Sequence, residues 1–176
     1  MLAQKSKDSY RSKSCNNWYP QTSFNIWITA TLYYGINNSL LAKMQRVQNC
    51  AARLVCKQKL GPNMMDKVFM DLHWLKVKFR NIYKILLIVH NCLHQNAPNE
   101  LSDLLHYADS ERTMNLIESK FCNKYGERAF SHVGPKLWNL LPRNIRDIHE
   151  TLNFKKALKS FLMIRGEEFC LWTKRK

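Results

Sequence analysis

The sequence predicts a mostly α-helical fold, a small irregular helical bundle around a buried central helix, with a flexible N-terminal arm. Apolar residues recur every three or four positions over long stretches, which is the period of amphipathic helices. Glycine and proline number only 5 each among 176 residues, too few for a turn-rich all-β chain. With 45% hydrophobic and 23% charged residues, the chain has the composition of about one globular domain.

Residues 1–38 differ in composition from the rest, being rich in Ser, Asn, Thr and Tyr without a helical period. We expect the first twenty or so to be flexible. They contain no apolar signal core, so we expect a cytoplasmic or nuclear protein that is not secreted, with its six cysteines reduced. The apolar stretch 24–34 fits a strand or a helix and is too short to span a membrane.

The first strongly patterned helix is predicted from Leu40 onward, and its end is expected at Gly61-Pro62. Apolar residues at intervals of four and three form one face, which we expect to pack on the core: Leu40, Met44, Val47, Ala51 and Leu54. One position earlier in the same register lies a basic stripe, about 100° round the helix: Lys43, Arg46, Arg53 and Lys57.

The next segments predict a short helix over 63–72 and then the central helix, which begins near Leu75. The central helix is apolar on all sides over 85–89, so we expect it to be buried, and Ala97-Pro98 is expected to end it. A short helix around 101–105 follows. Residues 107–124 are polar and predicted to be irregular, with a short strand near Phe121.

The C-terminal part begins with short helical pieces over 125–142, which Pro135 and Pro142 are expected to separate. Thr151 is the predicted N-cap of the last helix, and Gly166 its predicted end, followed by a basic tail over 166–176. The last helix has an apolar side of Phe154, Leu158, Phe161 and Leu162, and a basic side of Lys155, Lys156 and Lys159.

The sequence contains no motif that indicates a catalytic, cofactor or metal site. Glycine-rich phosphate loops, GxSxG and HExxH are absent, and the aspartates are scattered rather than paired. His90 and His94 are four residues apart and flank Cys92, but two further zinc ligands would be needed. We therefore expect no catalytic residue, no metal and no cofactor, and no enzymatic activity of this chain alone.

The net charge of +15 favours a polyanionic partner, and the charge is segregated along the chain. Residues 61–109 carry as many acidic as basic side chains, whereas 41–60 and 151–176 each carry an excess of five positive charges. A phosphate track needs several cations along one surface. The alternative is that both basic faces are merely solvated. The candidate nucleic-acid-binding residues are Lys43, Arg46, Arg53, Lys57, Lys155, Lys156 and Lys159.

Three stretches occur in a recognisable order: LAKMQRVQNCAARLV over 41–55, LHWLKVKFRN and onward over 72–105, and YGERAF with GPKLWNLLPRNIRD over 125–162. Together they resemble the C-terminal region of reverse transcriptases of LINE-type, non-LTR retrotransposons of the jockey-like and chicken-repeat kind. The resemblance covers about residues 35–165. Lys76 and Asn99 depart from it, because prolines are usual there.

The resemblance implies a domain over 39–165 that lies beyond the polymerase palm, in a parent that carries an endonuclease and an RNA-directed DNA polymerase. The aromatic-x-Asp-Asp signature of the polymerase has no counterpart here. The implied function is a non-catalytic module that holds template RNA or target DNA during target-primed reverse transcription. The expected partners are RNA or DNA phosphates and the remainder of the reverse transcriptase, with no membrane.

The function and the place of the tryptophans each have an alternative interpretation. In the alternative to nucleic-acid binding, the chain is a structural or protein-interaction domain, or a decayed element fragment with no independent activity. Trp74 and Trp138 are candidates for stacking on unpaired bases, but their apolar neighbours favour a place in the core.

Overall fold

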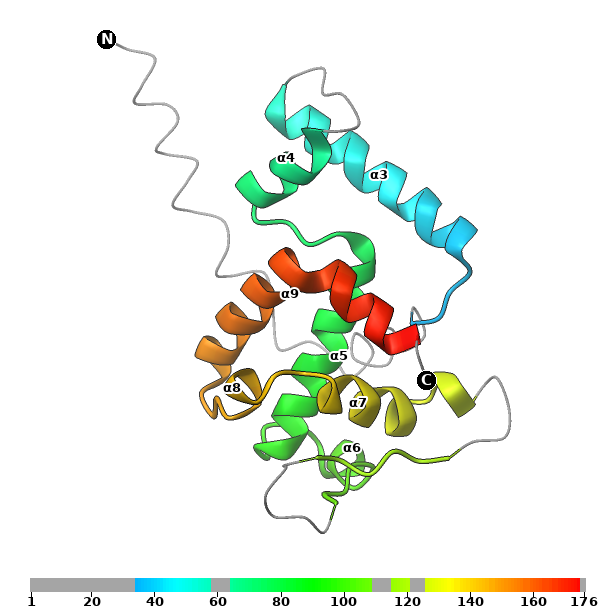
Figure 1. Cartoon of the computed structure of the whole chain (residues 1–176), viewed down its shortest axis with the longest axis vertical. Helices are drawn as coiled ribbons and strands as arrows, with labels where there is room; N and C mark the ends of the chain where they lie inside the picture. Colours follow the sequence, from blue (N-terminus) through cyan, green and yellow to red (C-terminus); the bar gives the residue numbers. More distant parts are fainter. Residues whose placement is uncertain (1–33, 58–63, 109–114, 121–125, 175–176) are drawn as a thin grey trace.

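The structure is a computed structural model that describes residues 34–57, 64–108, 115–120 and 126–174 (Figure 1). These residues are mostly helical, which confirms the predicted fold class: they form seven α-helices, labelled α3 to α9, and one 3-10 turn, η2. The predicted flexible arm falls on residues outside this description. No helix in the described ranges is long and apolar enough to cross a membrane.

Helices α3 (Asn38–Cys56) and α4 (Met65–Asp71) form a pair at the top of Figure 1. The side chain of Asn37 caps α3 by accepting a hydrogen bond from the Ser39 backbone N–H at 3.2 Å. The helix ends at Cys56, with Lys57 in the left-handed conformation (φ 51°), so it ends before Gly61-Pro62, contrary to prediction. The pair has a small core of its own: Ala52, Met65, Val68 and Phe69.

Helix α5 (Val77–Leu93) is the predicted central helix, and its burial is confirmed. It contacts α3, α6, α7 and α9, and Ile85, Leu86 and Val89 are fully buried in the main core. Its end lies at Leu93, earlier than the expected Ala97-Pro98, because Gln95 adopts a left-handed conformation (φ 56°) that a continuing helix excludes.

Beyond α5, Pro98 precedes the short helix α6 (Asn99–Ser102), close to the prediction. An isolated antiparallel bridge joins Tyr107 to Leu116. The Asn139 side chain holds Leu116 by hydrogen bonds of 2.8 Å to both its backbone N–H and its carbonyl. The strand expected near Phe121 falls outside the described residues.

Helix α7 (Phe130–Asn139) follows η2 (Gly126–Arg128), and α8 (Arg143–Arg146) begins after Pro142. Pro135 lies inside α7 and does not separate two helical pieces, so that part of the prediction is wrong. The Pro135 ring is fully buried, and this packing offsets the helical hydrogen bond that proline cannot donate.

The last helix, α9, runs from Thr151 to Lys174, so Gly166 does not end it and most of the predicted basic tail is helical. Thr151 is the first helical residue rather than the N-cap, since the Phe154 N–H already bonds to the Glu150 carbonyl at 2.9 Å. A Cβ atom on Gly166 would lie 2.9 Å from the Phe79 ring. The absence of a side chain at Gly166 therefore allows α9 to pack closely against α5. The predicted apolar side is correct, and burial continues beyond it to Phe169 and Cys170.

Candidate nucleic-acid interface

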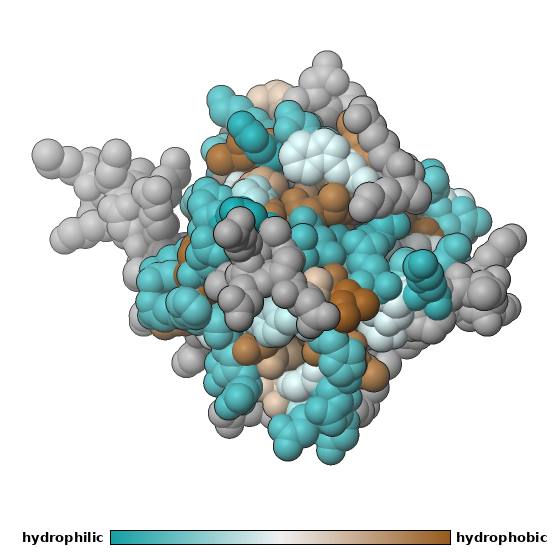
Figure 2. Space-filling model, turned by 60° about the horizontal axis from the view of Figure 1, so that its bottom comes forward, coloured by the Kyte–Doolittle hydropathy of each residue, from teal (hydrophilic) through white to brown (hydrophobic). Residues whose placement is uncertain are grey.

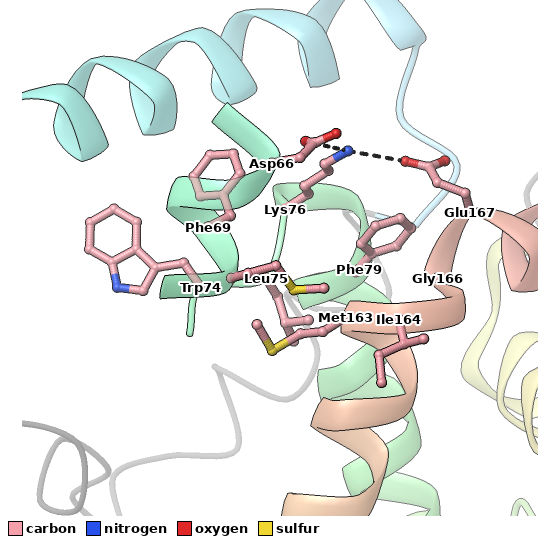
Figure 3. A pocket seen from close by; sticks show the side chains of 11 residues that line it. Asp66, Phe69, Trp74, Leu75, Lys76, Phe79, Met163, Ile164, Gly166 and Glu167 are labelled. Atoms are coloured by element: carbon pink, nitrogen blue, oxygen red, sulfur yellow. Dashed lines mark hydrogen bonds and ion pairs between the residues drawn. The ribbon is translucent and has the colours of Figure 1, made fainter. Parts of the chain in front are cut away.

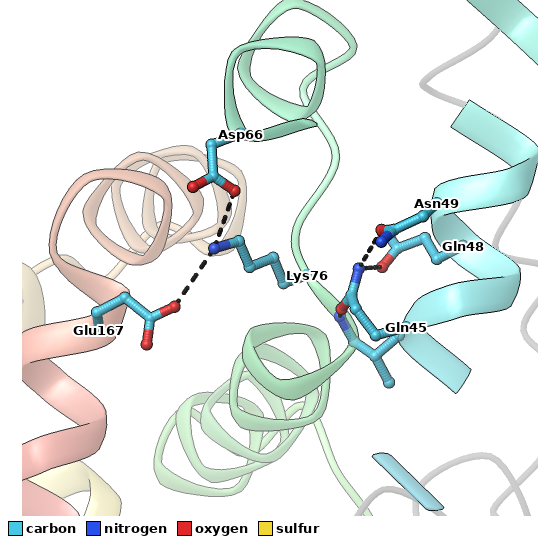
Figure 4. A network of polar contacts seen from close by, with 7 residues as sticks. Gln45, Gln48, Asn49, Asp66, Lys76 and Glu167 are labelled. Carbon is cyan, nitrogen blue, oxygen red and sulfur yellow. Dashed lines mark hydrogen bonds and ion pairs between the residues drawn. The ribbon is translucent and has the colours of Figure 1, made fainter. Parts of the chain in front are cut away.

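Helix α3 is attached to the start of α5 by side-chain amides rather than by its apolar residues (Figure 4). The Gln48 amide donates to the Leu75 carbonyl at 2.8 Å. The Val77 N–H, at the first turn of α5, donates to the Gln45 side-chain oxygen at 3.0 Å. The Gln45 amide in turn donates to the oxygens of Gln48 and Asn49, each at 3.0 Å. These bonds fix the rotation of α3 about its own axis, with the side chains of Gln45, Gln48 and Asn49 facing the start of α5.

This attachment corrects the sequence-based choice of the buried face. Of the five residues expected to pack on the core, Leu40, Met44, Val47 and Leu54 are exposed, Val47 by 71% and Leu54 by 78%, and Ala51 is half-buried. The buried residues of α3 are Gln48 and Ala52. The sequence does contain a pattern from which this attachment could have been predicted. The polar residues at positions 45, 48 and 49 are spaced so that they share one face of a helix, and such a face can form hydrogen bonds with a neighbouring element.

The basic stripe of α3 is exposed at all four of its positions: Lys43, Arg46, Arg53 and Lys57. Helix α3 contains no acidic residue. Within the described ranges the ion pairs are those of Lys76 with Asp66 and Glu167, so none of the four stripe cations is neutralised by a carboxylate. Three of these positive charges therefore face solvent along one side of α3, and the fourth, that of Lys57, lies at the left-handed C-cap just beyond the helix.

The second basic set, on α9, does not extend this stripe. Lys156 is exposed, whereas Lys155 and Lys159 are half-buried. The beginning of α9 lies beside α8, on the other side of the molecule from α3 in Figure 1. The structure therefore brings four of the seven candidate cations together and leaves the other three as a separate patch.

A pocket of about 270 Å³ lies between α4, α5 and α9 (Figure 3). Its lining is mostly apolar, and Lys76 at its edge bonds to Asp66 at 3.0 Å and Glu167 at 3.4 Å. Burial alone lowers the pKa of Lys76, but the two carboxylates outweigh it and hold the pKa above its usual value. A lysine nucleophile needs the opposite shift, so Lys76 acts as a tether between the helices.

Three histidines lie in a row where α5 ends and α9 begins. The His90 ring is fully buried and stacks on Phe154 with 4.1 Å between centroids, and its Nε2 lies 2.9 Å from the Ile148 carbonyl oxygen. His94 is 4.3 Å from His90, and His149 is 5.2 Å from His94. In the described part of the chain, no three His, Cys, Asp or Glu residues are placed to hold a metal ion.

The two tryptophans considered for base stacking belong to the packing of the fold. Trp138 is buried in the main core, and Trp74 is half-buried against the α3–α4 core, in agreement with the core interpretation. Of the described cysteines, Cys50 is exposed, Cys56 is half-buried, and Cys92 and Cys170 are buried. The other two lie outside the described residues.

The face of the molecule in Figure 2 is largely hydrophilic, with hydrophobic residues in separate patches. No protein-family model, curated protein or solved structure matches the chain.

Proposed function

We propose that this chain is a non-catalytic nucleic-acid-binding module that holds RNA or DNA by its phosphate backbone. The observation that carries the proposal is the basic stripe of α3, four exposed cations that form no ion pair with a carboxylate of the described residues. From position 43 to position 57 a helix rises by about 21 Å. That length corresponds to about six phosphates along one strand of a duplex.

The resemblance to the region beyond the polymerase palm of LINE-type reverse transcriptases supports the same proposal. In such a parent the module holds template RNA or target DNA while another part of the protein performs target-primed reverse transcription. The remainder of the reverse transcriptase is then a second partner of the chain.

Charge reversal within the stripe tests the proposal. Arg46→Glu with Arg53→Glu is compared with Lys120→Glu with Arg143→Glu, which makes the same change in net charge at exposed residues outside α3. Affinity for a fluorescent RNA hairpin and a DNA duplex is measured by anisotropy over a range of salt concentrations. We expect the stripe variant to bind more weakly and its salt slope to fall by about 2, one for each lost phosphate contact.

The control variant should keep most of its affinity and its slope. Because the four substituted residues are exposed, far-ultraviolet circular dichroism should show unchanged helix content in both variants. Equal losses in the two variants would mean that net charge alone, not the stripe, attracts nucleic acid. An unchanged affinity in the stripe variant would remove α3 from the interface.

A further inference from the structure

A row of exposed apolar side chains on α3 is not explained by nucleic-acid binding, because phosphates make no use of it. We name this row the α3 apolar stripe: Leu40, Met44, Val47, Leu54 and Val55. All five are exposed, and together they extend over about 22 Å of helix. Apolar residues gathered in this way on a soluble domain mark an interaction surface.

The two borders of the α3 apolar stripe differ, and this difference specifies the partner. At 100° per residue, Gln48 and Ala52 lie along one border, where α3 is buried against α4 and the start of α5. The other border is the basic stripe of Lys43, Arg46, Arg53 and Lys57. A partner that covers the apolar residues therefore meets positive charge along one edge.

We propose that the α3 apolar stripe is the docking surface for an acidic amphipathic helix of another protein. Such a helix places its apolar residues on the stripe and its carboxylates against the four cations. Leu40, Met44 and Val47 follow one another at intervals of four and three, and such a row provides a ridge that packs into the groove of a second helix. Charge complementarity sets the orientation of the partner and disfavours basic partners.

Other occupants fit the same surface less well. If a second copy of the chain packed antiparallel on α3, the four cations of one copy would face the same four cations of the other. Residues 1–33 of this chain carry four lysines and arginines against one aspartate, so they too are basic. A helix that lies on an anionic membrane carries Trp, Phe or Leu on its apolar face; the stripe has two leucines but no Trp or Tyr, the residues that anchor proteins at the membrane interface.

The test uses the full chain and a labelled peptide of 18 residues, with leucines on one helical face and glutamates on the flanks. A second peptide carries lysines in place of the glutamates, and phosphatidylcholine–phosphatidylserine vesicles probe the membrane alternative. The variant is Val47→Gln with Leu54→Gln. The matched control is Leu152→Gln with Ile164→Gln, which replaces two exposed apolar residues of α9.

We expect the glutamate peptide to bind the wild-type chain and the lysine peptide not to bind. The Val47→Gln, Leu54→Gln variant should raise the Kd of the glutamate peptide by about tenfold or more, and the control variant should leave it unchanged. Affinity for an RNA hairpin should be the same in wild type and in the Val47→Gln, Leu54→Gln variant, which separates this proposal from nucleic-acid binding. Absence of glutamate-peptide binding, equal binding of both peptides, or an unchanged Kd in the Val47→Gln, Leu54→Gln variant would overturn it. Binding to vesicles but not to the glutamate peptide would overturn the proposal and show that the α3 apolar stripe binds a membrane surface rather than a protein helix.

Discussion

The contact between α9 and α5 at Gly166 gives the sharpest prediction about the fold. A Cβ atom at position 166 would lie 2.9 to 3.0 Å from three carbon atoms of the Phe79 ring, and that ring is only 5% exposed. Because the ring cannot swing into solvent, Gly166→Ala forces the two helices apart. Overpacking of this severity costs about 2–3 kcal/mol, while alanine in place of glycine inside a helix regains about 1 kcal/mol. The net effect is a destabilisation of about 1–2 kcal/mol.

Thermal unfolding followed by circular dichroism measures this effect. For a chain of this size about 1 kcal/mol changes Tm by about 2–4 °C, so Gly166→Ala should lower Tm by about 2–8 °C. Ser160→Ala, at an exposed position of α9, is the control for helix propensity and should not lower Tm. Phe79→Leu combined with Gly166→Ala should be less destabilised than the sum of the single variants. A rise in Tm for Gly166→Ala would show that α9 does not press on Phe79, and the reasoning would be refuted.

Three further predictions concern buried polar groups. Gln48→Ala leaves the Leu75 carbonyl without its 2.8 Å hydrogen bond and should lower the free energy of unfolding in urea by about 1–3 kcal/mol; no change would mean that α3 is not held there. Burial lowers the pKa of His90 below 6.5, so its neutral form is favoured by folding. Stability should be level between about pH 6.5 and 8 and decline as the pH falls below 6.5, and a urea midpoint that stays level down to pH 5 would contradict this. Burial raises the pKa of the Cys92 thiol to about 11, so iodoacetamide should modify it far more slowly than exposed Cys50 at pH 8, as peptide mass spectrometry can show.

The sequence was sufficient to predict the helices and the central place of α5. The apolar run over 85–89 leaves no polar side for solvent, and the structure buries Ile85, Leu86 and Val89 completely. Burial on α9 was also predictable, since Phe154 and Leu158 repeat at helical spacing. Hydrophobic periodicity works in these cases because, in the described part of the chain, the apolar faces of both helices pack into the same main core.

The orientation of α3 was not predictable by the same rule. Its most apolar face was expected inside, but Gln48 donates to the Leu75 carbonyl and Gln45 accepts from the Val77 N–H. These bonds join segments far apart in the sequence, and periodicity contains no information about them. Gly166 is a similar case, because a glycine fits a helix end as well as a close helix contact, and only the position of Phe79 decides between the two.

The candidate site was predictable in its residues but not in its extent. Positions 43, 46 and 53 share one side of a helix wherever that helix packs, position 57 follows directly after its end, and all four are exposed. Whether the lysines of α9 extend the same surface depends on how the helices are arranged, and the structure places them elsewhere.

The most direct test of the central claim is the salt dependence of binding of the wild-type chain to an RNA hairpin and a DNA duplex. Four phosphate contacts from the basic stripe of α3 predict that the logarithm of the association constant for duplex DNA falls with the logarithm of salt concentration with a slope of about −3.6. The Kd should then rise about 150-fold between about 50 and 200 mM salt. Absence of binding at the lower concentration, or an affinity that does not depend on salt, would contradict the assignment of the stripe as a phosphate-binding surface.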